Sequence, residues 1–464
     1  MLQDRYKTDK IFEGILKLTN EMEPVLAKID QLLDDEALYQ LIRDDLARRY
    51  PKTEMTGRNS TPVEVILRML AVRRLFRLSY EQTEYQVRDS LVLRQFCRVY
   101  LRDVPDDTTL LRWAGVIQPE TLEQFNDRLT ELARQLKVTR GRKLRTDGTV
   151  VETNIHPPSD SSLLADSVRV LGRTLSRAKQ VLSEQVALGQ EVYRNRIRSA
   201  RRLARQVGEA MRRGEEHARN EGQMAYRKLI RAAEAMIAQA QQVLPVLQAQ
   251  ATRQTQRLAL TLATFIPRAQ QVVAQAIRRV LHQEKVPAGE KIVSIFEPHT
   301  DIIRRNKAHK PTEYGHKVWL DEVDGGIVTR WEVLQGNPND ERQWLPSLDH
   351  HLKRFGKAPQ QASADRGVHS HENELQAQQR GVQRVILPWP GRRSEARLKH
   401  ERQSWFVRGR KWHNGVEGRI SVLKRRYELN RCRDHGEDSF EKWVGWGVIA
   451  ANLTTISRMV AVQF

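Results

Sequence analysis

Residues 144–155, LRTDGTVVETNI, decide the fold of this chain, because they place an acid among residues that favour β-strands. The Asp-Gly pair at 147–148 is a strong signal for a tight turn between two hairpin strands. The Thr, Val and Ile residues around it are typical of one continuous strand. On this pattern alone, Asp147 is either the first residue of a turn or a carboxylate that a strand holds in place.

The chain before this stretch, residues 1–137, is predicted to be helical. Ser79 followed by Gln82 predicts a capping box, and Thr61 followed by Pro62 and Glu64 predicts a second helix start. Arginines lie between the apolar positions of these helices. Two interpretations remain open: a helix-turn-helix that enters a DNA groove, or a plain helical bundle with solvated arginines.

Residues 159–285 are rich in Ala, Gln, Arg, Leu and Val. Their apolar spacing predicts two or three long helices that fold back as a hairpin or coiled coil, with breaks near Gly214, Gly222 and Pro267. The segment carries no obvious chemistry. It is interpreted as a structural arm or as an arm that clamps DNA or dimerises.

Strand patterns return after residue 286. KIVSIFEP, YGHKVWLDEV and GGIVTRWEVLQ predict three strands, and a helix capped by Asp340 follows them. A strand in QQASADRGV, a helix in SHENELQAQQR, a strand in VQRVILPW and helices from about residue 412 complete the chain. This alternation around a helical interruption predicts one mixed α/β domain that is split by an insertion.

The chain of 464 residues carries 78 Lys and Arg against 57 Asp and Glu, a net charge of +21. Such a balance favours a polyanionic partner, nucleic acid first and an anionic membrane surface second. Two cysteines, Cys97 and Cys432, without a CxxC pair argue against a disulfide framework or a structural zinc site. The N-terminal residues show no secretory signal, and the apolar segment WVGWGVIAANL is too short to span a bilayer, so we expect a cytoplasmic protein.

Three carboxylates stand out by their contexts. Asp147 lies in strand-forming sequence, and Asp365 lies in ADRGVHS, where a strand ends and a helix begins. Glu417 lies on a polar stripe of a helix, with Lys424 seven residues later on nearly the same face. Each also has an ordinary structural explanation: a turn, a loop and a solvated helix face.

Taken together, these segments resemble the bacterial insertion-sequence DDE transposases, of the ISNCY-like type whose first motif reads DGTVVETNIH. TDGTVVETNIHPPSDSSLL is similar to the first catalytic motif, and YGHKV, GNPND and ADRGVHS are similar to the middle blocks. HNGVEGRISVLKRRYELNRCRDHG followed by AANLTTI resembles the final block, and the helices that end in DDTTLLRW resemble the usual leader. The resemblance covers nearly the whole chain in order, except for about residues 165–285.

The resemblance implies an α/β chain in three parts. Residues 138–158 and 286–464 would form a ribonuclease-H-like DDE catalytic domain, which the helical insertion 159–285 interrupts. Residues 1–137 would form an N-terminal all-helical, DNA-binding domain. The implied catalytic and metal-binding triad is Asp147 on the first strand, Asp365 at the end of the fourth strand, and Glu417 on a later helix. The resemblance therefore favours the strand interpretation of Asp147.

Cleavage of a phosphodiester needs an in-line nucleophile and a stabilised leaving oxygen, which two Mg²⁺ ions can provide. Mg²⁺ prefers oxygen ligands, and Mn²⁺ can substitute. Asp147 would bridge both ions, and the enzyme would cut the ends of an insertion sequence and join the 3′-hydroxyl to target DNA. The expected partners are double-stranded DNA, as terminal repeats and target, and further copies of this chain in at least a homodimer. No membrane partner is expected, and the location would be cytoplasmic, at the nucleoid.

Related enzymes often carry a Tyr-Arg-Glu-Lys pattern around the last acid. Lys424 fits the final place, whereas Arg410 and His413 occupy the places of Tyr and Arg. These three, with Lys411, Arg392 and Arg393 from a basic stretch that also holds Trp389, Trp405 and Trp412, are the candidate DNA-binding residues. The tryptophans are read equally well as core residues.

Other interpretations of the chain compete with the transposase. His369 and His371 lie beside Asp365 in sequence and suggest a zinc or iron site, which is the less favoured interpretation. The chain as a whole is also compatible with a catalytically inactive or regulatory DNA-binding protein derived from a transposase. A different ribonuclease-H-like nuclease is a further alternative. A coiled-coil scaffold would explain residues 159–285 alone.

Overall fold

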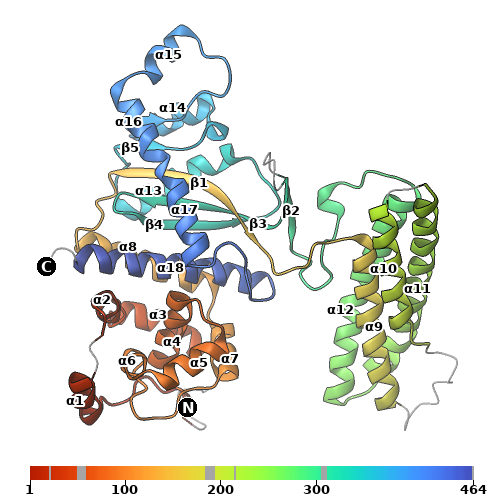
Figure 1. The fold of residues 1–464 in the computed structure, drawn as a ribbon. Coiled ribbons are helices and arrows are strands. Elements are labelled where there is room, and N and C mark those ends of the chain that lie inside the picture. Colours follow the sequence, from red (N-terminus) through yellow and green to blue (C-terminus); the bar gives the residue numbers. More distant parts are fainter. Residues whose placement is uncertain (20–21, 50–58, 183–193, 214–215, 305–310, 462–464) are drawn as a thin grey trace. The chain divides into compact units, whose positions relative to one another are not determined.

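The computed structural model describes residues 1–19, 22–49, 59–182, 194–213, 216–304 and 311–461 (Figure 1). The chain divides into two compact units. Residues 1–154 and 316–464 form the first unit, and residues 155–315 form the second. The three-part division expected from the sequence stays a prediction.

The first unit begins with helices, as the sequence predicts. They are α1 (Lys10–Thr19), α2 (Pro24–Leu32), α3 (Glu36–Ala47), α4 (Val63–Phe76), α5 (Tyr80–Asp89), α6 (Leu91–Phe96), α7 (Asp107–Val116) and α8 (Pro119–Gln135).

Two predicted helix starts in this region have different outcomes. Ser79 and Gln82 form the predicted capping box at the start of α5. The predicted cap at Thr61 is wrong, because α4 follows Pro62 without any side-chain cap. Glu64 is instead engaged by the buried Arg68, 3.2 Å away, so its carboxylate does not close a capping box.

A mixed sheet follows the helices. Its strands are β1 (Lys143–Glu152), β3 (Thr312–Val323), β4 (Ile327–Leu334), β5 (Gln361–Ser363) and β6 (Arg384–Ile386). Their order is β4-β3-β1-β5-β6; β3 and β4 are antiparallel, whereas β1, β5 and β6 are parallel. Strand β1 runs straight through Asp147, so this residue does not begin a hairpin turn. The expected mixed α/β class agrees with this sheet and its many helices.

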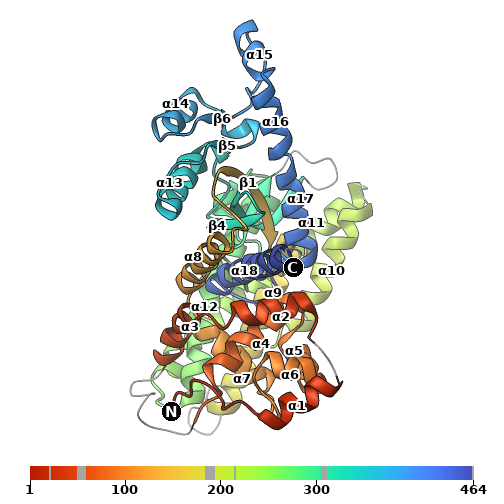
Figure 2. The same ribbon diagram turned by 90° about the vertical axis from the view of Figure 1, so that its left-hand side faces the viewer.

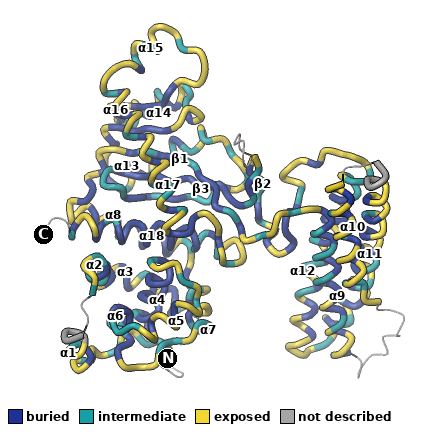
Figure 3. The backbone as a smooth tube through the Cα atoms, viewed as in Figure 1, coloured by how far each residue is buried: buried dark blue, intermediate teal, exposed yellow. Residues whose placement is uncertain are grey.

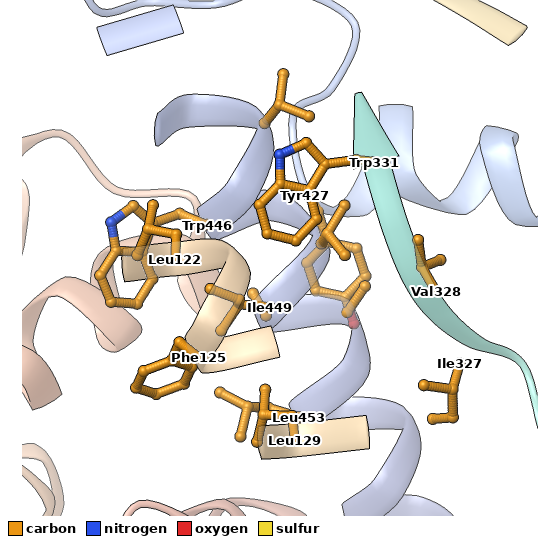
Figure 4. Packing of buried hydrophobic residues seen from close by; sticks show 14 of the residues in the cluster. Leu122, Phe125, Leu129, Ile327, Val328, Trp331, Tyr427, Trp446, Ile449 and Leu453 are labelled. Carbon is orange, nitrogen blue, oxygen red and sulfur yellow. The ribbon is translucent and has the colours of Figure 1, made fainter. Parts of the chain in front are cut away.

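Helices cover the sheet on both sides. Figure 2 shows α13 (Trp344–Phe355) on one side and α17 (Gly415–Arg426) on the other. Helices α8 and α18 (Glu437–Ala461) contact each other and the edge strand β4. Their apolar side chains form the core shown in Figure 4, which contains Leu122, Phe125 and Leu129 of α8, Ile327, Val328 and Trp331 of β4, Tyr427 after α17, and Trp446, Ile449 and Leu453 of α18.

Two buried asparagines satisfy the outer backbone groups of the edge strand β4. Asn452 accepts a hydrogen bond from the Val328 N–H at 3.0 Å and donates one to the Val328 carbonyl at 2.7 Å. Asn126 donates to the same carbonyl at 3.0 Å and accepts from Asn452 at 2.7 Å. Because buried backbone groups without partners are costly, these bonds fix α8 and α18 on the sheet edge. Asn452 of the AANLTTI block therefore has a structural role.

The second unit is a helical bundle. It contains α9 (Asp160–Leu182), α10 (Ile197–Arg213), α11 (Glu216–Gln248) and α12 (Arg253–Ala276), so the estimate of two or three helices is too low. Helix α11 continues through Gly222 and α12 continues through Pro267, where breaks were expected; Gly214 lies outside the described residues. Glycine and proline inside a helix reduce its stability, but a continuous apolar face compensates for this loss through packing. Figure 3 shows the buried residues of these helices.

The chain leaves the bundle through the π-helical turn η1 (Ile277–Leu281), the short helix η2 (Ala288–Glu290) and strand β2 (Asp301–Arg304), which pairs with residues 312–315 of β3. The predicted strand at 291–298 is wrong. The Gln275 amide binds the N–H of Ile292 at 2.9 Å and its carbonyl at 3.3 Å, and Ser294 accepts from the N–H groups of Phe296 and Glu297. Side chains thus occupy backbone N–H and C=O groups that would otherwise pair with a neighbouring strand.

Asp340 does not cap a helix, contrary to the prediction. It begins the short helix η3 (Asp340–Gln343), whose N-cap is Asn339, and its carboxylate lies 2.5 Å from Lys317 Nζ. The remaining elements of this region are η4 (Arg366–Val368), α14 (His371–Gln379), α15 (Glu395–Glu401) and α16 (Ser404–His413).

Candidate functional site

The strand register places Asp147 beside Asp365. Strands β1 and β5 are parallel neighbours, with Arg145 paired to Ser363. Asp147 and Asp365 each lie two residues beyond that pair, and adjacent strands are about 4.8 Å apart. Successive side chains alternate between the faces of a strand, so Asp147 lies on the same face of β1 as Arg145. Two acids that are 218 residues apart in sequence thus become neighbours.

The two aspartates have opposite electrostatic environments. Burial, and then the negative charge of Asp365, raise the pKa of Asp147 to about 6, although the Gly148 N–H donates to its carboxylate at 2.7 Å. The hydrogen bond from His413 lowers the pKa of Asp365, whose side chain is 68% exposed. The site therefore holds one carboxylate that resists ionisation next to one that favours it.

Helices α16 and α17 lie close against the sheet because of two glycines. A Cβ at Gly409 would lie 2.2 Å from Ile386 of β6, and one at Gly415 would lie 2.5 Å from the Arg145 guanidinium. Arg145 cannot easily move, since it donates to the Trp412 carbonyl at 2.6 Å and is also held by Glu322.

This close approach brings His413, the last residue of α16, onto the sheet. His413 is buried, and its Nε2 lies 3.0 Å from Asp365 Oδ1. Its Nδ1 has no hydrogen-bond partner among the described residues. The imidazole therefore fixes the orientation of the Asp365 carboxylate rather than pointing into solvent.

Glu417 lies in the first turn of α17, one turn after His413. Its side chain is exposed and makes no hydrogen bond or ion pair with any residue that the structure describes. The positive end of the helix dipole favours an acid there. Within the described ranges, no three His, Cys, Asp or Glu side chains are gathered closely enough to form a metal cluster. The structure thus brings Asp147 and Asp365 together and leaves Glu417 on the helix above that face of β1.

Lys317 and Asp340 lie next to Gly148, the residue that follows Asp147 on β1, and the sequence patterns predicted no role for them in the site. Lys317 of β3 is buried, donates to the Pro338 carbonyl at 2.8 Å and pairs with Asp340. A Cβ at Gly148 would lie 3.1 Å from Lys317 Cε and 3.5 Å from Asp340 Oδ1. Asp340 also contributes to the raised pKa of Asp147. The sequence could have indicated them, because Lys317 belongs to the YGHKV block and Asp340 to the GNPND block.

The candidate DNA-binding residues have different surroundings. Arg410 and Lys411 are exposed on α16, and Arg392 is exposed before α15, whereas Arg393 lies 3.0 Å from Glu401. Lys424 is half-buried on α17, and His413 contacts Asp365 as described above.

The tryptophans of this region are partly engaged by the protein. The Arg145 guanidinium lies 4.8 Å from the Trp412 ring centroid, and Trp405 packs edge-on against His400 and Phe406. Trp389 is 38% exposed and packs against His369. His369 thus lies against an aromatic ring and 3.6 Å from Glu374, and it belongs to no metal cluster in the described part of the chain.

A pocket of about 630 Å³ opens along the C-terminal half of α17. Arginines from α17, α18 and the end of α4 line it, and no carboxylate does. Arg419 is held by Glu322, whereas the other four guanidinium groups form no ion pair with the described residues. The arginines are Arg77, Arg419, Arg425, Arg426 and Arg458.

Comparison with protein families shows that residues 15–115 fit the model of a transposase domain, DUF772. The match supports a transposase family and a transposase function for this chain. No curated protein and no solved structure matches the sequence. None of the described helices combines the length and apolarity needed to cross a bilayer.

Proposed function

We propose, starting from the transposase-domain match, that this protein is an ISNCY-like DDE transposase that cleaves DNA at insertion-sequence ends and joins the 3′-hydroxyl to target DNA. The observation that carries the proposal is that the parallel neighbours β1 and β5 bring Asp147 of β1 beside Asp365, which lies two residues after the end of β5. Helix α17, which carries Glu417, contacts β1. A regulatory protein that only binds DNA would have no need for acids in this arrangement.

The strand order supports a ribonuclease-H-like catalytic fold. Without β2, the strands of the sheet follow the chain as β1, β3, β4, β5 and β6, and β1 lies at the centre. The first acid is then on the first strand, the second comes directly after the fourth strand, β5, and the glutamate is on a later helix. These are the positions that the family resemblance implies.

The donors fit a hard divalent cation. Asp147 and Asp365 offer only oxygen ligands, and the raised pKa of Asp147 indicates that its negative charge lacks compensation. Asp147, Asp365 and Glu417 would hold two Mg²⁺ ions, or Mn²⁺ in their place. When bound, these ions would activate the attacking hydroxyl and stabilise the leaving oxygen of the phosphodiester.

The protein's own groups would orient this site and hold the DNA. His413 is a positioning residue, because it fixes the Asp365 carboxylate. Arg410, Lys411, Arg392, Arg393 and Lys424 would contact DNA phosphates. We expect the enzyme to act as a homodimer or larger assembly on paired terminal repeats, in the cytoplasm at the nucleoid.

A strand-cleavage assay tests the proposal. The substrate is a labelled duplex that carries the terminal repeat flanking this reading frame, incubated with Mg²⁺, Mn²⁺, Ca²⁺ or EDTA. Cutting at the repeat boundary with Mg²⁺ or Mn²⁺, and none with EDTA, is the expected result. Specific binding without cutting in any metal would overturn the proposed enzyme and favour the regulatory alternative.

The pH dependence of cleavage should report Asp147. Because the pKa of Asp147 is about 6, the carboxyl is protonated below that pH and can no longer bind a cation. At limiting Mg²⁺ we expect the single-turnover rate to fall about tenfold per pH unit below about pH 6. Raising the Mg²⁺ concentration should move the midpoint to lower pH. A rate that stays constant from about pH 8 to about pH 5 would exclude this assignment.

The arginine pocket along α17 should contribute to DNA affinity. The test is the triple variant Arg425→Gln, Arg426→Gln and Arg458→Gln. Each phosphate contact contributes about 0.9 to the slope of log affinity against log salt concentration, so each lost contact lowers the slope by about 0.9. We therefore expect the slope to fall by up to about 2.7, as measured by fluorescence anisotropy in EDTA at several salt concentrations.

The matched control for the pocket removes three arginines that already have acidic partners. Arg5, Arg380 and Arg431 lie 2.8, 2.6 and 2.8 Å from Glu36, Asp349 and Glu152. Their replacement by Gln changes the net charge equally. Equal slopes in the two triple variants would show that the pocket does not contact DNA.

A further inference from the structure

Helix α10 of the bundle carries six exposed arginines on one side. At about 100° per residue, they fall within an arc of about 120°, and they extend over about 22 Å of the helix axis. The only acid on this helix, Glu209, lies within the same arc. The arginines are Arg198, Arg201, Arg202, Arg205, Arg212 and Arg213.

The opposite side of α10 is used to build the bundle. Ala200, Leu203, Val207 and Ala210 are buried, and the helix contacts α9 and α11. The arginine side of α10 therefore faces solvent, as the exposed segments of this helix in Figure 3 illustrate.

The α10 arginines lack acidic partners, in contrast to Arg169 and Arg278 of the same unit. Arg169 lies 2.7 Å from Asp166, and Arg278 lies 2.8 Å from Glu290 and also contacts Glu284. None of the six α10 guanidinium groups forms an ion pair within the described part of the chain. Like charges at i,i+3 and i,i+4 destabilise a helix, so this face gains most from a polyanion.

A DNA duplex fits this face better than a membrane does. A helix that binds in a membrane interface inserts an apolar face among the lipids, and the apolar face of α10 is already buried in the bundle. Duplex DNA presents one negative charge per about 1.7 Å of its axis, so a 22 Å row of arginines meets several phosphates. Because the neutralisation of phosphates does not depend on sequence, we expect this face to bind the backbone of any duplex.

We propose that the exposed arginine face of α10 binds the phosphate backbone of a DNA duplex. The inserted bundle is then a DNA-contacting module, with a surface of its own in addition to the residues near Asp147 and Asp365. The identity of the duplex rests on the proposed transposase function, but the surface itself depends only on the arrangement of charges.

The test is a hydroxyl-radical footprint of the full-length protein on terminal-repeat DNA in EDTA. We expect the variant Arg201→Gln, Arg202→Gln and Arg205→Gln to lose one protected segment and keep the rest. Its affinity for a random-sequence duplex should fall about tenfold or more at about 0.1 M salt. Glu209→Gln removes the acid from the same face and should tighten that binding.

The control for α10 is the double variant Arg169→Gln and Arg278→Gln, which removes charges that are already paired; it should keep the full footprint. A triple variant with unchanged footprint and unchanged affinity for random duplex would overturn the proposal. Loss of binding to phosphatidylserine vesicles, with DNA binding intact, would assign the face to a membrane instead. Absence of any terminal-repeat footprint in the unmodified protein would reject the transposase function. The affinity of the triple variant for random-sequence duplex would still show whether α10 binds DNA.

Discussion

Asp147→Asn is expected to lower Mg²⁺-dependent DNA cleavage by at least about a thousandfold and to leave DNA binding nearly unchanged. Asparagine has almost the same shape as aspartate, so the strand and its neighbours remain in place. The loss follows from the missing negative ligand beside Asp365. Cleavage and binding are measured on the same labelled duplex, with and without Mg²⁺.

The same variant should be more stable than the unmodified protein in EDTA. The folded pKa of Asp147 is about 6, against an ordinary value of 3.8, so the folded state binds the proton more tightly than the unfolded state. Stability therefore falls as pH rises from about 4 to about 6, and the penalty persists above that range. At neutral pH the penalty amounts to at most about 3 kcal/mol, which asparagine removes.

Mg²⁺ should reverse part of this difference, because a cation that binds only the folded state stabilises the unmodified protein. Thermal melts in EDTA and in Mg²⁺ measure both effects. Asp321→Asn is the control: Asp321 is a second aspartate of this sheet with a raised pKa, but it accepts a hydrogen bond from Ser347 at 2.7 Å, away from Asp365. Normal cleavage by Asp147→Asn would remove Asp147 from the catalytic site.

Arg68→Met is expected to lower the free energy of unfolding by roughly 3–5 kcal/mol. Arg68 is fully buried in α4 and lies 2.5 Å from Asp30, 2.5 Å from Asp34 and 3.2 Å from Glu64. Without it, Arg98 is left to offset these three acids, with Arg5 3.8 Å from Glu64 alone. The cost arises mainly from Asp30 and Glu64, whose side chains are only 18% and 12% exposed and lose a buried partner, rather than from the lost contact alone.

Urea unfolding followed by circular dichroism measures this effect. Arg380→Gln provides the control, because Arg380 and Asp349 form an exposed pair whose loss should cost less than about 1 kcal/mol. Arg68→Lys should recover only part of the stability, since one ammonium group cannot reach three carboxylates as a planar guanidinium does. A loss below about 1 kcal/mol for Arg68→Met would show that the network contributes little.

The sequence by itself determined the elements whose signals are local. The Ser79 capping box, the strands around Asp147 and Val385, and the helix after Ser370 all formed where the residue pattern predicts them. These signals succeed because a cap or an alternation of side chains acts within a few residues. The motif blocks also singled out Asp147 and Asp365, although nothing local in either stretch decides between a site and a turn or loop.

Only the tertiary structure decided which of these residues meet. Asp365 reaches Asp147 through the order of parallel strands, and His413 reaches Asp365 because Gly409 and Gly415 let two helices approach the sheet. Long-range contacts also prevailed over local signals. Asp340 pairs with Lys317 instead of capping a helix, and the Ile292 backbone bonds to the Gln275 side chain instead of to a neighbouring strand. Sequence patterns record what each segment prefers alone, whereas the partners in these four pairs are 17 to 218 residues apart and become neighbours only when the chain packs.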